Sequence, residues 1–236
     1  MRLPTQLPTR LPSQCAVCHG WGIGRVCDAC LLRFNAPVPR CQRCALRVPA
    51  AVAACGNCLT HPPPFTRTLA AVDYAYPWNS LITRFKFHAA LDLAPALARQ
   101  LEGAVRAAGD ACPTLLLPAP LSVARLRERG FNQSWELARR LGRSLRCPAD
   151  AHLLLRTRDT PHQLALPVER RAGNVRAAFA VEPRRAGELA GRHVALVDDV
   201  MTTGATAAEM ARVLLQAGAA RVDVWVVART PRPDEA

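Results

Sequence analysis

Eight cysteines in the first quarter of the chain form a pattern that suits metal binding. They occur as four pairs with two residues between the partners: Cys15 and Cys18, Cys27 and Cys30, Cys41 and Cys44, Cys55 and Cys58. Two sulfurs at this spacing can face one ion from a single tight turn, so each pair supplies half of a tetrahedral zinc site. The four pairs therefore predict two structural Zn²⁺ sites.

A disulfide framework and a redox motif are the competing interpretations of these cysteines. The start of the chain lacks the apolar run of a secretory signal, so we expect a cytoplasmic protein with reduced thiols. A redox pair would occur once, beside a β-α-β pattern, rather than four times. The spacing leaves open which pairs share an ion. Sequential sharing needs only short connections, and we prefer it to a crossed arrangement.

A second segment, whose residue types could take part in binding or catalysis, follows an apolar run at residues 194–197. Asp198 and Asp199 come first, and a turn of small and hydroxyl residues comes next: Thr202, Thr203, Gly204, Ala205 and Thr206. Such a turn lets main-chain N–H groups approach a phosphate, and the start of a helix adds partial positive charge. The two carboxylates suit ribose hydroxyls or a magnesium shell. The turn has no lysine, which disfavours a nucleoside triphosphatase P-loop.

This segment resembles the signature of type I phosphoribosyltransferases, which use 5-phosphoribosyl 1-pyrophosphate (PRPP). By position, the resemblance implies that Asp198 and Asp199 hold the ribose hydroxyls and that residues 202–206 hold the 5′-phosphate. Two further stretches, residues 118–133 and 160–179, resemble the ComF/GntX family. The four cysteine pairs upstream are the layout of the same family, so the resemblance covers the chain from about Cys15 to Thr230.

Membership of the ComF family implies a fold, ligands and a biological role. It implies a zinc-ribbon module before a phosphoribosyltransferase domain that binds PRPP with Mg²⁺. It also implies a part in natural competence and DNA uptake, where imported single-stranded DNA is handled alongside a competence helicase or other DNA-processing proteins. Arg129, Asn132 and Gln133 are the expected grip on pyrophosphate, and Arg129 would act with the two aspartates if transfer occurs. Asn132 is equally explained as a helix cap.

Two alternatives stay open at the level of sequence. One is a nucleobase or nucleotide phosphoribosyltransferase of salvage metabolism whose zinc module is purely structural. No residue identifies an acceptor base, so the sequence leaves catalysis undecided, together with the oligomeric state. The other concerns the DNA surface, which is either the arginines of the zinc module (Arg40, Arg43 and Arg47) or the arginines from Arg125 to Arg176.

The elements that must position these residues alternate between strand and helix patterns. Strands are predicted at residues 69–76, 115–117, 193–197 and 222–228. Helices are predicted at residues 78–87, 92–108, 132–145 and 206–217. This alternation predicts an α/β fold with a Rossmann-like parallel sheet, which places ligands beyond the carboxyl ends of the strands.

Composition limits what the chain can be in three respects: its core, its membrane segments and its partners. A hydrophobic content of 50% in 236 residues supports a real core, and no apolar stretch approaches the length of a membrane span. The net charge of +13 favours polyanionic partners. The prolines after His61 indicate a linker, so we divide the chain into a zinc module at 1–64 and a transferase-like domain at 65–236. We expect Trp21 to be packed rather than stacked on bases.

Overall fold

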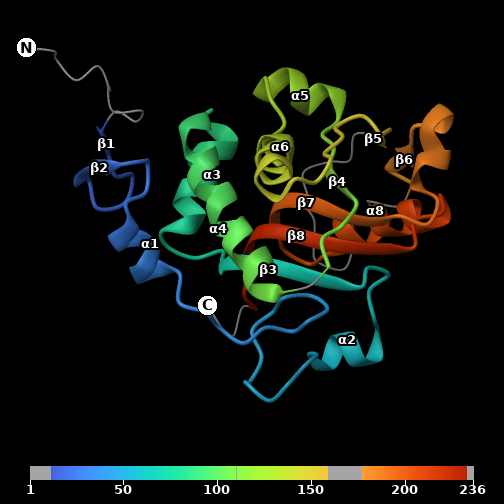
Figure 1. Ribbon diagram of the computed structural model, residues 1–236, viewed down its shortest axis with the longest axis horizontal. Coiled ribbons are helices and arrows are strands. Elements are labelled where there is room, and N and C mark those ends of the chain that lie inside the picture. Colours follow the sequence, from blue (N-terminus) through green and yellow to red (C-terminus); the bar gives the residue numbers. More distant parts are fainter. Residues whose placement is uncertain (1–11, 110, 159–176, 233–236) are drawn as a thin grey trace, which may run out of the picture.

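The centre of the computed structural model is a parallel sheet of four strands in the order β3-β8-β7-β4 (Figure 1). The structure describes residues 12–109, 111–158 and 177–232. The strands are β3 (Arg67–Asp73), β4 (Leu115–Pro118), β7 (His193–Met201) and β8 (Arg221–Arg229). All three pairings between neighbouring strands are parallel, which confirms the predicted α/β fold.

Helices connect these strands much as the hydrophobic pattern predicts. They are α3 (Trp78–Phe87), η1 (Leu91–Leu93), α4 (Ala94–Ala108), α5 (Val123–Arg129), α6 (Gln133–Leu145) and α8 (Ala205–Gln216). A short antiparallel pair, β5 (Leu154–Arg156) and β6 (Phe179–Val181), is followed by η4 (Pro183–Leu189). Helix α3 has the predicted bounds, and α6 begins directly after Asn132.

Alternate residues of the strands face two separate cores. On β8, Val224 and Val226 belong to the core beneath α8, whereas Trp225 and Val227 belong to the core that contains α3, α4 and α6. A strand presents successive side chains to opposite faces, so a sheet covered on both faces produces two cores. Both faces of the sheet are therefore closed by helices. The carboxyl ends of the strands are left to form a site.

The cysteine pairs lie in two short segments that pack on opposite faces of the sheet. The first cysteine segment (residues 12–35) holds β1 (Pro12–Gln14), β2 (Trp21–Ile23) and α1 (Asp28–Phe34). The second cysteine segment (residues 40–60) holds α2 (Gly56–Thr60). Figure 1 shows the first at the left of the molecule and the second below the sheet. Buried cysteines of the first join the α3–α4–α6 core, and those of the second join the α8 core.

One strand is longer than its apolar pattern suggests. Strand β7 continues beyond Val197 to Met201, because Asp198, Val200 and Met201 keep their pairing with Val226, Ala228 and Arg229 of β8. Asp198 and Asp199 therefore lie on regular strand backbone rather than in a loop. Within the described residues, the helices are too short or too polar to span a membrane.

Candidate functional site

Each cysteine segment brings four sulfurs together. The clusters are Cys15, Cys18, Cys27 and Cys30 in the first segment, and Cys41, Cys44, Cys55 and Cys58 in the second. Within each cluster the sulfurs lie within 4.8 Å of one another. Consecutive pairs thus share a cluster, which confirms the preferred sequential arrangement. All eight are free thiols, so the disulfide alternative finds no support.

The spacing of the sulfurs fits a tetrahedral zinc ion. A Zn–S bond of about 2.3 Å gives a tetrahedron whose edge is about 3.8 Å. The sulfur–sulfur distances are 3.9 Å for Cys15–Cys30, 3.7 Å for Cys18–Cys27 and 3.6 Å for Cys44–Cys55. A disulfide would need about 2 Å. Both clusters could therefore bind zinc without rearrangement.

Main-chain N–H groups favour the metal-binding form of one thiol in each cluster, Cys15 and Cys41. The Cys15 sulfur accepts from the N–H groups of Val17 and Cys27 at 3.5 and 3.4 Å. Burial alone would raise the pKa of this thiol, but the N–H donors outweigh it and lower the pKa to about 6. In the second cluster, the N–H of Cys55 donates to the Cys41 sulfur at 3.3 Å. A thiolate is the ligand that zinc requires, so the turns favour the zinc-binding form of these two thiols, whereas burial raises the pKa of Cys30, Cys44 and Cys58.

The arginines of the second cysteine segment are held by the rest of the chain. The Arg40 guanidinium donates to Asp73 at 2.7 Å, and Arg47 pairs with the other oxygen of the same carboxylate. Arg43 donates to the carbonyl of Thr66 at 3.2 Å. Asp73 is the last residue of β3, and its side chain is only 9% exposed. These contacts fasten the segment to the sheet, which matches a structural role for the three arginines.

The two aspartates at the end of β7 have different partners. The Asp198 carboxylate accepts from the Ser134 hydroxyl at 2.8 Å and from the Asp199 N–H at 2.9 Å. The Asp199 carboxylate pairs with the ammonium of Lys86, whose Nζ lies 2.9 Å from Oδ2 and 3.2 Å from Oδ1. Ser134 is in the first turn of α6 and Lys86 is near the end of α3. The aspartates therefore occupy separate environments although they are neighbours in sequence.

These environments push the two pKa values apart. Burial, together with the neighbouring Asp199 charge, raises the pKa of Asp198 to about 7. Burial would also raise the pKa of Asp199, but the Lys86 ammonium more than offsets it and holds that pKa below its usual value. At neutral pH, Asp199 is therefore a fixed carboxylate, whereas Asp198 is close to its titration midpoint.

A cavity of about 270 Å³ opens beside these aspartates at the carboxyl edge of the sheet. Its charged lining residues are Lys86, Arg125, Arg129, Arg156, Asp198 and Asp199. Its apolar wall includes Tyr74, Phe87 and Leu121. The Arg129 guanidinium lies over the Phe87 ring, 5.3 Å from its centroid, and donates to the Gln133 side chain. Cationic groups from α3 and α5 thus face two carboxylates across one hollow.

The turn after β7 forms a second, smaller cavity of about 70 Å³. It is lined by the five residues of the phosphate turn (residues 202–206), and two of them, Thr202 and Thr206, also line the larger cavity. Gly204 has φ +82°, and a Cβ there would lie 3.1 Å from the end of the Met201 side chain, so only glycine fits. The N-cap residue of α8 is Gly204, which has no side chain to accept from the helix start, and the Ala205 N–H donates to the Thr203 hydroxyl of the turn at 3.3 Å.

Most of the site residues expected from sequence meet at these two cavities. Asp198, Asp199, Arg129, Gln133 and the phosphate turn all line one or the other. Asn132 does not: its oxygen accepts from the N–H groups of Ser134 and Trp135, and its amide donates to the Ala119 carbonyl. It caps α6, as the alternative explanation proposed. The residue 160–179 signature lies outside the described residues except at its last three positions.

Sequence reasoning missed Lys86 and Ser134. Lys86 is the only lysine among the 31 lysine and arginine residues of the chain. This was the one feature of the sequence that set it apart from the other cationic residues. Its partner Asp199 is 113 positions away, so no local pattern links them. Ser134 was assigned no role, yet it is fully buried against Asp198. Trp21 was expected to be packed but is 76% exposed, because the three-residue strands of the first segment enclose no core of their own.

Comparison with known proteins identifies the class of the domain. The family model for the phosphoribosyl transferase domain matches residues 89–236. The chain is thus a protein with a type I phosphoribosyltransferase domain, whose sheet carries the aspartate pair and the phosphate turn.

Relatives narrow the class further. DNA utilization protein YhgH of Escherichia coli (strain K12) is 37% identical over 230 residues, which cover 93% of this chain and 98% of that protein. Competence protein F of Haemophilus influenzae is 34% identical over 175 residues, covering 72% and 76%. Competence protein ComFC of Bacillus subtilis (strain 168) is 29% identical over 160 residues, covering 66% and 62%. The chain belongs to the ComF family of phosphoribosyltransferase-domain proteins.

Proposed function

We propose that the larger cavity binds PRPP with Mg²⁺ and that the chain takes part in the handling of single-stranded DNA. The names of its relatives refer to DNA utilization and to competence, which supports a role with DNA. One observation carries the first part. An aspartate pair, a helix start without a side-chain cap and the guanidinium of Arg129 converge on adjoining cavities at one edge of the sheet. That combination offers partners for ribose hydroxyls, a phosphate and a pyrophosphate at once.

Each part of PRPP has a group suited to it. The phosphate turn and the start of α8 would hold the 5′-phosphate, because these residues line the smaller cavity. Asp198 and Asp199 would accept hydrogen bonds from the ribose hydroxyls. Arg129 and Arg125 on α5, with Lys86, supply positive charge for the pyrophosphate. Lys86 has a second task, since it keeps Asp199 ionised.

Metal ions complete the proposal. Asp198 and the hydroxyls of Thr202 and Thr206 line the larger cavity and are the hard oxygen donors that Mg²⁺ prefers. When bound with PRPP, Mg²⁺ would neutralise charge on the pyrophosphate. The two cysteine clusters would hold one Zn²⁺ each as structural ions. Reduced thiolates of this kind fit a cytoplasmic location.

Calorimetry of PRPP with Mg²⁺ tests the ligand. We expect binding by the parent protein and at least a tenfold loss in Asp199→Asn and Gly204→Val. Glu102→Gln, which changes a surface pair on α4, is the matched control. PRPP binding that survives unchanged in both site variants contradicts the assignment.

The pKa of Asp198 predicts how the PRPP affinity measured in this experiment should change with pH. The carboxylate accepts hydroxyl groups better than the neutral acid does, so PRPP affinity should fall as the pH drops through about 7. The ionised fraction changes about tenfold between pH 8 and pH 6, and the affinity should change comparably. Phosphate groups of the ligand also titrate near pH 6. Asp198→Asn isolates the protein's share, because its affinity should retain only the ligand's own pH dependence.

For single-stranded DNA, we propose α5 and the mouth of the cavity as the contact surface. Arg40, Arg43 and Arg47 are all engaged within the chain, which removes the main argument for the zinc module. Helix α5 instead places Arg125 and Arg129 at the cavity, and it exposes Arg127 beside Val123 and Leu126. Arginine with exposed apolar groups suits a flexible polyanion with weak base preference.

A pair of charge-matched variants tests this surface. Arg127→Ala should weaken binding of a labelled oligo(dT) and reduce the salt dependence, because fewer phosphate contacts release fewer counterions. Arg143→Ala is the control, since it removes one exposed arginine at the far end of α6. Equal losses in both variants would indicate a general charge effect and contradict a surface on α5. Repeating the titration with PRPP present shows whether the two ligands compete at the cavity mouth.

A second candidate is a transferase that places the ribose on a flat acceptor. It is favoured by the apolar wall of Tyr74, Phe87 and Leu121, which faces the charged side of the same cavity. Pyrophosphate release from PRPP in the presence of each nucleobase tests it. Release that depends on one base establishes the transferase. Binding of PRPP without release by any base leaves PRPP as a ligand of a DNA-handling protein.

A further inference from the structure

Arg229 is a buried arginine that joins two parts of the molecule. It is the last residue of β8 and is 4% exposed. Its Nε donates to the carbonyl of Cys44 at 2.7 Å, and its Nη1 donates to the carbonyl of Met201 at 3.0 Å. Nη1 also donates to the carbonyls of Thr202 and Thr230. One side chain therefore contacts both the second cysteine cluster and the first residue of the phosphate turn.

The charge of Arg229 needs a counterion that its hydrogen bonds do not supply. All four acceptors are neutral main-chain carbonyls, and a buried cation is costly without nearby negative charge. The second cysteine cluster lies directly beside this side chain, because the carbonyl that accepts from Nε is that of Cys44. Four thiolates around one Zn²⁺ leave a net charge of −2. The loaded second cluster is thus the counterion that matches this guanidinium.

At its other end, the Arg229 side chain holds the residues from which the phosphate turn starts. Met201 ends β7 and Thr202 opens the turn, so their carbonyls set the direction in which the chain leaves the sheet. The Met201 carbonyl also accepts from the N–H of Thr230 at 3.0 Å. Two residues later, Gly204 reverses the chain at positive φ and α8 begins. Fixing Met201 and Thr202 therefore fixes the backbone of the turn that lines the smaller cavity.

We propose that Arg229 is a positioning residue that couples the second zinc site to the phosphate turn. Zinc in the second cluster strengthens phosphate binding at the turn, and a ligand at the turn strengthens zinc binding by that cluster. The two effects must be equal in size, because coupling between two binding sites is reciprocal. The proposal rests on the turn being the phosphate site of PRPP.

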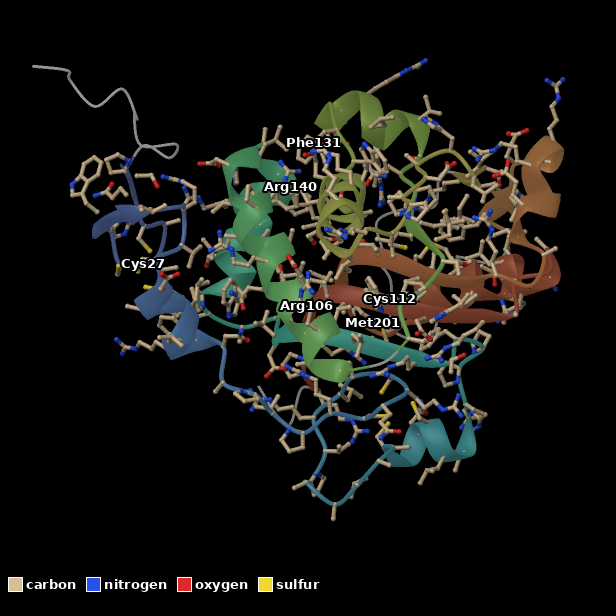
Figure 2. All side chains as sticks on the ribbon, in the orientation of Figure 1. Cys27, Arg106, Cys112, Phe131, Arg140 and Met201 are labelled. Atoms are coloured by element: carbon tan, nitrogen blue, oxygen red, sulfur yellow. The ribbon has the colours of Figure 1, made fainter. Side chains whose placement is uncertain are left out.

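The first cysteine cluster provides an internal control. Its segment is fastened to the other face of the sheet, where the Phe34 carbonyl accepts from the Trp78 indole and Arg25 pairs with Asp92. Figure 2 shows Cys27 at the outer left edge of the molecule, well separated from Met201. A ligand at the turn should therefore leave zinc in the first cluster unaffected.

Cysteine alkylation followed by mass spectrometry tests the coupling on the full zinc-loaded chain. A thiol reagent modifies each cluster as its zinc leaves, and peptide masses separate the two clusters. We expect PRPP with Mg²⁺ to slow modification of the second cluster at least fivefold and to leave the first unchanged. Arg229→Gln should abolish this protection. Arg221→Gln, at the opposite end of β8 where the side chain contacts Asp223, should keep it.

Hydrogen exchange without ligand separates this proposal from the proposed function. Arg229→Gln should speed exchange of the amides at residues 202–206 at least fivefold over the parent and Arg221→Gln. Arg229→Lys keeps the charge with fewer donors, so its values should fall between those of the parent and Arg229→Gln. If PRPP fails to bind but Arg229→Gln still loosens the turn and the second cluster together, the coupling stands and the ligand assignment falls. If Arg229→Gln leaves both at parent values, the coupling is wrong even where PRPP binds.

Discussion

The two cysteine segments share a ligand pattern but differ in how the rest of the chain surrounds them. All four sulfurs of the second cluster are buried, whereas in the first Cys18 is exposed and Cys27 is half-buried. The second segment is held by Asp73 and Arg229. The first instead exposes Trp21, Ile23 and Leu32. Spacing therefore identifies a cluster that could bind zinc, while burial and anchoring determine whether that cluster is part of the scaffold of the domain.

The largest expected effect concerns the zinc ligands themselves. Cys44→Ser should lower the melting temperature by more than about 10 °C, because the second cluster shares a core with the sheet and metal loss exposes that core. Cys18→Ser should lower it by less than half as much, since its sulfur already faces solvent. Differential scanning calorimetry with zinc analysis measures both. Equal losses would show that the two segments are equivalent parts of the scaffold.

Replacing the carboxylates that anchor the two cysteine segments should destabilise the protein less than losing a cysteine of the second cluster. Asp73→Asn should cost about 2–4 kcal/mol, because it leaves the guanidinium groups of Arg40 and Arg47 without their carboxylate in a largely buried site. Asp92→Asn should cost less than about 1 kcal/mol, because the pair between Arg25 and Asp92 is half exposed. Urea unfolding of both variants gives the two free energies. If Asp92→Asn cost more free energy of unfolding than Asp73→Asn, the first cysteine segment would be the more firmly anchored of the two.

The smallest effect is expected at Trp21. Trp21→Ala should change the free energy of unfolding by less than about 0.5 kcal/mol, because its ring is 76% exposed. Trp78→Ala is the contrast: that ring is 2% exposed and donates to the Phe34 carbonyl, so its loss should cost about 3–5 kcal/mol. Loss of an iodide-quenchable fluorescence component in Trp21→Ala would confirm the exposure. A destabilising Trp21→Ala would mean that another surface covers this ring.

Local patterns predicted much of this molecule. The apolar periodicity located α3, and the N-cap preference of Asn132 located the start of α6. The short connections between cysteine pairs were enough to favour the sequential clusters. In these cases the determining interactions lie within a few residues of one another, so the chain itself displays them. The division at residue 64 stays a prediction, and limited proteolysis near the prolines would test it.

Long-range partners were beyond local patterns. The ion pair of Lys86 and Asp199 and the pairing of Arg40 with Asp73 each join distant segments. Arginines between the cysteine pairs looked like a surface for nucleic acid, and only the fold shows that a buried carboxylate holds two of them. The exposure of Trp21 was missed for the opposite reason, since residue type predicts burial but the segment offers nothing to bury it.

The contact between Arg229 and Cys44 also has a consequence for the order of events during synthesis. These residues are 185 positions apart, so the cysteines of the second cluster emerge from the ribosome long before the strand that covers them. At about 5–20 residues per second, the interval is about 10–40 s. During that time the four thiols have no core to enter. We therefore expect this cluster to capture its proposed zinc ion before β8 arrives to bury it.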